Sequence, residues 1–126
     1  MDKKVVKYFS MDGITLVKEP IKLDLLKNIA AANGSDLVKA VIDVMENIMA
    51  IGGEMHADEE KYLMELDSMQ KNLWGINIYP DKERNNWIEF DSMINIRPTH
   101  NNRSRGVDNP EIQKKIIEIV NSLIKQ

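Results

Sequence analysis

Hydrophobic and polar residues alternate along two stretches of the chain, residues 73–79 and residues 87–97. A period of two is typical of a half-buried β-strand, because successive side chains point to opposite faces of a sheet. The polar segment 81–86 lies between the two stretches and can connect them as a hairpin. The pattern therefore predicts two antiparallel strands with one apolar and one polar face.

The parity of the second stretch makes a specific prediction. Ile94 and Ile96 share one parity, and we expect them to enter the core. Asn95 and Arg97 should then project from the same face as Asp91, away from the core. The argument fails if Arg97 points inward while Ile96 lies in solvent.

A second hairpin is predicted over residues 38–55. Apolar residues alternate along 38–44, and Asn47 can end a short turn because asparagine tolerates positive φ. An alternative is one long helix over residues 36–50, capped by Asp36. The β-branched residues favour the hairpin.

Helical spacing appears in two places between these strands. Residues 21–29 repeat apolar positions at helical intervals, and the pair Asn33-Gly34 can end that helix. A second helix begins near Asp58 with an acidic first turn, which suits the helix dipole. Leu63 and Leu66 would be the buried residues of this helix.

The last helix has the clearest start signal. Asp108 or Asn109 can cap it, and Pro110 occupies its first turn. An apolar stripe follows at helical spacing: Ile112, Ile116, Ile119, Val120 and Leu123.

With a first strand at residues 14–18, the order of elements is β-α-β-β-α-β-β-α. This order predicts an α+β fold, a mostly antiparallel sheet of about five strands with helices covering one face. A chain of 126 residues is expected to form a single domain, residues 1–126, with residues 1–12 as a poorly ordered or peripheral N-terminus.

Composition narrows the classes of function. The absence of cysteine excludes a disulfide scaffold, a thiolate zinc site and a cysteine nucleophile. The formal net charge of -3 argues against bulk electrostatic binding to nucleic acid. No apolar run is long enough for a signal peptide or a membrane span. We therefore expect a cytoplasmic protein that binds neither membrane nor nucleic acid.

One cluster could hold a metal ion. Glu54, His56 and Asp58 alternate along the chain, and mixed imidazole and carboxylate ligands suit zinc, manganese or iron. His56 and Asp91 are also candidates for catalytic acid–base work, because an imidazole titrates near neutrality. The simpler alternative is that Asp58 caps a helix while Glu54 and His56 are solvated surface residues.

A second cluster could bind an anion. Arg97, Arg103 and Arg105 lie in one loop that leads to the start of the last helix. Arginine binds phosphate and carboxylate groups bidentately, and helix N-termini attract anions. The asparagines expected beside these arginines complete the set of candidate ligand-binding residues: Asn77, Asn95 and Asn102. Alternatively, the arginines pair with the surplus carboxylates of the chain.

Three functions follow from these clusters. The leading hypothesis is a binding module that holds a small phosphate- or carboxylate-bearing ligand on the polar sheet face. The second is a metal-dependent hydrolase or phosphoryl-transfer enzyme that uses Glu54, His56 and Asp58, with a divalent metal as cofactor. The third is a non-catalytic interaction protein that forms a homodimer.

Four phrases resemble a known family. LVKAVIDV, IMAIGGEMHADEE, LWGINIYP and the run IEFDSMINIRP followed by RSRGV resemble the small prokaryotic proteins of the family DUF5674, over about residues 14–124. The resemblance implies a compact cytoplasmic protein from a bacterium or archaeon. It implies no activity, cofactor or catalytic residue.

Overall fold

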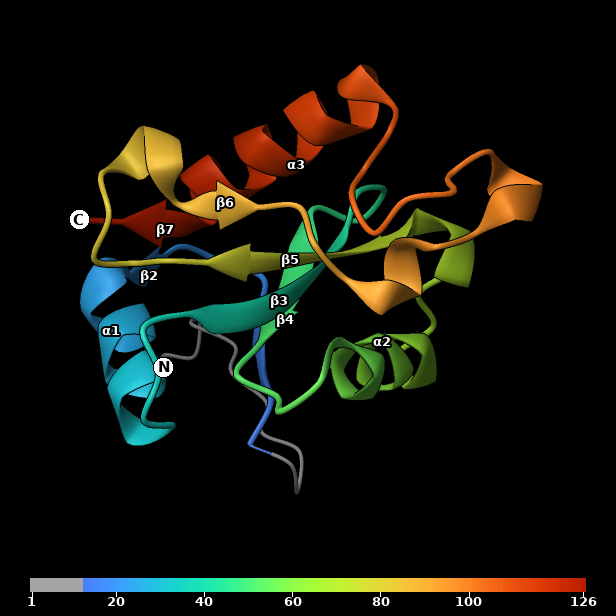
Figure 1. Cartoon of the computed structure of the whole chain (residues 1–126). Helices are drawn as coiled ribbons and strands as arrows, with labels where there is room; N and C mark the ends of the chain where they lie inside the picture. The colour runs from blue at the N-terminus through green and yellow to red at the C-terminus, as the bar shows by residue number, and fades with distance from the viewer. Residues whose placement is uncertain (1–12) are drawn as a thin grey trace.

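The computed structural model describes residues 13–126, so the prediction for residues 1–12 lies outside the described residues. These described residues form three α-helices: α1 (Leu23–Ala32), α2 (His56–Glu65) and α3 (Pro110–Leu123). The main sheet contains β1 (Thr15–Val17), β3 (Val38–Asp43), β4 (Ile48–Ile51), β5 (Leu73–Ile78) and β6 (Ile88–Glu89). Figure 1 shows these elements in their spatial arrangement.

The five strands lie in the order β1-β4-β3-β5-β6, and every neighbouring pair is antiparallel. The predicted hairpin of β3 and β4 is confirmed, and the alternative helix over residues 36–50 is wrong. Asn47 has the positive φ of 60° that the turn requires. The α+β class and the antiparallel sheet are therefore as predicted.

A second, two-stranded sheet was not predicted. β2 (Ile21–Lys22) pairs in parallel with β7 (Ile124–Lys125), which joins the start of α1 to the end of α3. Ile21 thus belongs to a strand rather than to the first helix.

The helices lie on both faces of the sheet, as Figure 1 shows for α2 and α3. α1 and α3 cover the predicted face, where Ile42 and Trp74 belong to the larger hydrophobic cluster. α2 covers the opposite face, where its Leu63 packs with Val41. The prediction that helices cover one face holds for α1 and α3 but not for α2, because Val41 and its neighbours form a second apolar surface.

The helix ends follow the sequence signals. Gly34 has a φ of 64° just beyond α1, and the Asn109 side chain accepts a hydrogen bond of 2.9 Å from the Glu111 N–H at the start of α3. Leu66 is 47% exposed, so its predicted burial is wrong. Within residues 13–126, no helix is both long enough and apolar enough to span a bilayer.

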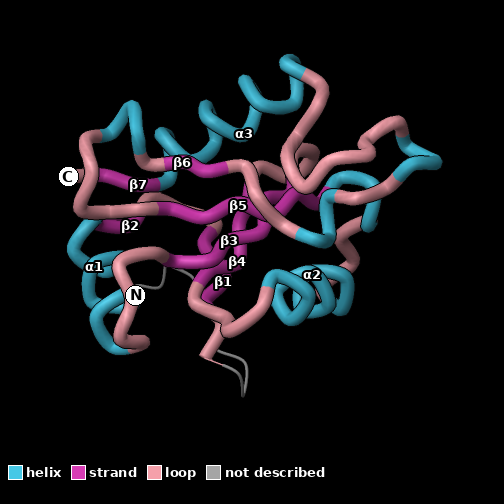
Figure 2. The backbone as a smooth tube through the Cα atoms, in the orientation of Figure 1, coloured by secondary structure: helices cyan, strands magenta, loops and turns pink. Residues whose placement is uncertain are grey.

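The chain between β6 and α3 is mostly irregular (Figure 2). It contains two short 3₁₀ turns, η3 (Met93–Asn95) and η4 (Pro98–His100), and two others flank β5 and β6, η1 (Gln70–Asn72) and η2 (Arg84–Asn86). The predicted strand over residues 87–97 therefore ends after Glu89. Ser92 accepts a hydrogen bond of 3.3 Å from the Ile94 N–H, a local turn that competes with extended backbone.

Candidate functional site

The outer edge of β5 is the structural centre of the polar region. β6 pairs only with Asn77 and Ile78, so the rest of this edge lacks a strand partner. Buried backbone groups without partners are costly, and side chains take the place of the missing strand. Asn95 Oδ1 accepts from the Gly75 N–H at 2.8 Å, and Asn95 Nδ2 donates to the Gly75 carbonyl at 3.0 Å.

Arg97 closes the far end of the same edge. Its guanidinium donates to the carbonyls of Leu73, Gln70 and Ile94, the last two at 2.8 and 3.1 Å. It also lies 4.5 Å from the ring centre of Trp74. Burial lowers the pKa of Arg97, but the side chain stays charged.

These contacts overturn the predicted orientation of residues 94–97. Asn95 is fully buried, Arg97 turns toward β5, and Ile96 is 37% exposed. Because the strand stops at Glu89, the period-two argument has no strand to act on. Asn95 and Arg97 therefore lie in the place of a strand partner rather than on a free polar face.

Asn102 has a similar architectural position. Its Nδ2 donates to the carbonyls of Asn95 and Gly106 at 2.7 and 2.8 Å, and its Oδ1 accepts from the Asp108 N–H at 2.7 Å. The side chain is buried. Asn102 thus ties the loop to the segment before α3.

A cavity of about 450 Å³ opens beside the part of this edge where Asn77 pairs with Glu89 of β6. It is lined by four predicted site residues: His56, Asn77, Asp91 and Arg105. Glu89 also lines it, and the sequence analysis missed two further residues that contribute polar or charged groups: Lys39 and Tyr79. Arg103, which was also predicted, is exposed and does not line this cavity.

His56 forms one wall of the cavity. Its Nε2 lies 2.7 Å from the Ile76 carbonyl, which can only accept, so Nε2 carries a proton. The pKa of His56 is lowered, mainly by burial and also by the charge of Lys39. The hydrogen bond to Ile76, the charge of Asp91 and the Asn77 side chain raise this pKa but do not outweigh the effect of burial. The neutral ring therefore keeps a lone pair on Nδ1.

Asn77 has an unsatisfied acceptor. Its Nδ2 donates to Glu89 Oε1 at 2.9 Å, which fixes the orientation of the amide. Its Oδ1 is buried and has no hydrogen-bond partner. A neutral imidazole cannot supply a donor from Nδ1, whereas an imidazolium could.

Two positive features face the cavity. Lys39 makes no ion pair within residues 13–126. The cavity is also lined by Met55, the N-cap of α2, and by the first two residues of the helix, and no side chain caps that end. Free N–H groups of a helix's first turn attract anions. Lys39 lies opposite Asn77 in the β3–β5 register. This proximity could not be predicted from the sequence without knowing that β3 and β5 are neighbours.

The two carboxylates of the cavity are engaged. Arg105 Nε lies 2.5 Å from Asp91 Oδ1, and Glu89 Oε1 accepts from both Asn77 and the Tyr79 hydroxyl. The Arg105–Asp91 pair matches the alternative in which arginines bind surplus acids. The hydrogen bonds from Asn77 and Tyr79 leave the negative charge of Glu89 in place, so Lys39 and Arg105 together balance the formal charge of the two carboxylates.

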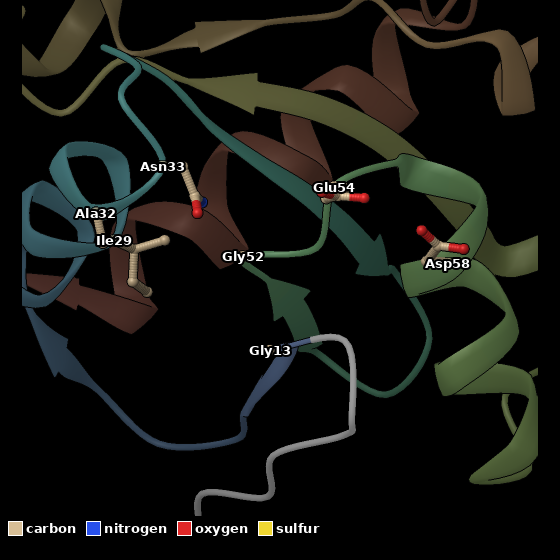
Figure 3. Close-up of a pocket in the computed structure, with 7 residues that line it drawn as sticks. All are labelled: Gly13, Ile29, Ala32, Asn33, Gly52, Glu54 and Asp58. Atoms are coloured by element: carbon tan, nitrogen blue, oxygen red, sulfur yellow. The ribbon is translucent and has the colours of Figure 1, made fainter.

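The predicted metal ligands separate into two cavities. Glu54 and Asp58 line a different pocket, beside the end of α1, and Figure 3 shows both at the side opposite Ile29 and Asn33. His56 lines the cavity described above. β4 ends at Ile51 and α2 begins at His56, so Glu54 and His56 do not share a strand face. Residues 13–126 contain no group of three histidine, cysteine, aspartate or glutamate side chains placed to hold a metal ion.

Glu59 is a buried carboxyl that the sequence analysis did not single out. Its Oε2 accepts from the Gly53 N–H at 2.8 Å, while Oε1 has no hydrogen-bond partner. Burial raises the pKa of Glu59 well above its ordinary value, although the Gly53 bond and Lys39 lower it. Glu59 precedes the buried Leu63 by four residues, so the two side chains lie on the same face of the helix. This spacing could have predicted that Glu59 is buried.

These features define a small α+β protein with a ligand-sized cavity at an incompletely paired sheet edge. The chain belongs to the family described as Protein of unknown function (DUF5674), whose model matches residues 15–123. This confirms the resemblance found in the sequence. Comparison with curated proteins and comparison with solved structures each gave no match.

Proposed function

We propose that this protein binds a small anion in the cavity between Lys39 and the first turn of α2. The observation that carries this proposal is a helix N-terminus without a side-chain cap that opens on the same cavity as Lys39, which makes no ion pair within residues 13–126. The helix dipole and free N–H groups favour an anion there, and Lys39 adds a full positive charge. Arg105, held by Asp91, contributes a further guanidinium at the rim.

The chemistry of His56 supports the same proposal. An anion beside the imidazole favours its protonated form. Because Nε2–H already donates to the Ile76 carbonyl, the second proton of an imidazolium lies on Nδ1. Binding of an anion is therefore expected to be linked to the uptake of one proton by His56.

Isothermal titration calorimetry with inorganic phosphate and with sulfate tests the proposal. We expect both anions to bind the wild-type protein, and Lys39→Met to weaken both at least about tenfold, a loss of about 1.4 kcal/mol. Lys114→Met is the matched control, because Lys114 is exposed on α3 and does not line the cavity. The proposal fails if neither anion binds at millimolar concentration, or if Lys39→Met binds as well as the control.

A further inference from the structure

We propose that the anion carries an aromatic ring, which lies between the side chains of Met55 and Met93. This inference rests on the proposed function and adds the class of ligand. The ring would sit at the mouth of the cavity, and the phosphate or carboxylate group would lie deeper, near Lys39 and the first turn of α2.

The two methionines form an apolar rim. Met55 is 60% exposed and Met93 is 65% exposed, although they come from different elements, the N-cap of α2 and the first residue of η3. Both line the same cavity. Single exposed apolar residues are ordinary, but two that converge on one cavity form a contact surface.

Other apolar side chains line the same cavity. They are Leu37, Ala57 and Ile94. These side chains offer no hydrogen bonds to an inorganic anion. They instead match an apolar body attached to the charged group, which is the usual division of a small-molecule site into apolar walls and a few polar anchors.

The size of the cavity leads to the same class of ligand. Its volume of about 450 Å³ is within the range of roughly 300–1,000 Å³ that is typical of sites for organic molecules. A phosphate group has five heavy atoms and leaves most of that space empty. A single aromatic ring attached to it fits the remaining volume.

Contacts at the rim favour a ring over an aliphatic chain. Arg105 Nη1 lies 3.3 Å from the Met93 sulfur, and Arg105 is itself held by Asp91. Thioether sulfur and guanidinium groups both make favourable contacts with aromatic rings. The rim therefore places two such groups at one position.

A comparison of phenyl phosphate with methyl phosphate tests the inference, because the two esters carry the same anionic group. We expect phenyl phosphate to bind the wild-type protein about tenfold more tightly in a calorimetric titration. The double variant Met55→Gln/Met93→Gln should remove this preference, so that the two esters bind with the same affinity. Met45→Gln is the control, because Met45 is 69% exposed and does not line the cavity.

Each outcome decides the matter. Equal binding of the two esters by the wild-type protein overturns the inference and leaves the proposed function intact. Persistence of the preference in the double variant also overturns the assignment to the two methionines. If neither ester binds, the inference and the proposed function fail together.

Discussion

The two ends of β5's outer edge carry similar polar residues with different consequences. At the closed end, Asn95 and Arg97 bond to the backbone that β6 leaves unpaired. At the end that β6 pairs, Asn77 Oδ1 has no hydrogen-bond partner, and Lys39 on the neighbouring strand β3 makes no ion pair, within residues 13–126. Polar side chains beside a sheet can therefore have two different roles: they can replace a missing strand, or they can form a binding surface.

The largest expected effect comes from the closed end. Asn95→Ala leaves the buried N–H and carbonyl of Gly75 without side-chain partners, and each unsatisfied group costs roughly 1–3 kcal/mol. We expect a loss of about 3 kcal/mol in the free energy of unfolding, measured in urea. Asn85→Ala, at an exposed position, should change it by less than about 0.5 kcal/mol. Equal stability of the two variants would show that Asn95 does not replace a strand.

A second prediction concerns how closely the η3 segment approaches β5. A Cβ at Gly75 would lie 2.6 Å from both Cβ and Oγ of Ser92, so Gly75→Ala should cost about 2 kcal/mol through overpacking. Adding Ser92→Gly removes both clashing atoms and should restore part of that loss. Urea unfolding of the two single variants and the double variant measures the rescue, and strictly additive losses would contradict the close approach.

The third prediction concerns Glu59. Its raised pKa means that the folded protein holds the proton more tightly, so this stabilisation is present below the ordinary value of 4.5 and is lost as pH rises through the folded pKa. Glu59→Gln keeps an acceptor for the Gly53 N–H and should raise the melting temperature at pH 7 but not at pH 4. Glu65→Gln, exposed on the same helix, should leave the difference between the two pH values unchanged. No gain for Glu59→Gln at pH 7 would contradict this account.

The smallest expected effect is on the pH dependence of binding. The lowered pKa of His56 means that the folded protein resists protonation, so its contribution to stability falls as pH drops below 6.5 toward the folded pKa. Sulfate should oppose this loss and bind more tightly as pH falls, because its charge is constant in this range while imidazolium forms. Calorimetry of His56→Gln should give a flatter profile. An identical profile for both proteins would remove His56 from the proton uptake.

Much of the fold was accessible from local sequence patterns. The β3–β4 hairpin follows from alternation around a turn at Asn47, and α3 follows from the Asn109 cap and its apolar stripe. These signals act within a few residues of the chain, so no knowledge of the tertiary structure was needed.

The candidate site was less accessible, because it depends on where the extended backbone stops. In the sequence, hydrophobic and polar residues alternate as far as Arg97. In the structure, a turn begins at Ser92, so the side chains that follow do not alternate between two faces of a sheet. Lys39 was missed because it meets Asn77 only through the β3–β5 register. His56 and Asn77 were predicted as site residues because of their positions in alternating strands. In the structure, they line the cavity and are held there by contacts with the Ile76 carbonyl and with Glu89.

Mapping of chemical shifts by NMR tests the central claim most directly. In a titration with phenyl phosphate, we predict the largest changes at the backbone amides of His56 and Ala57 and at the side-chain amide of Asn77. The signals of Asn95 and Arg97 at the closed end should move much less. Largest changes at Arg103 and the start of α3, or no changes at all, would contradict the account.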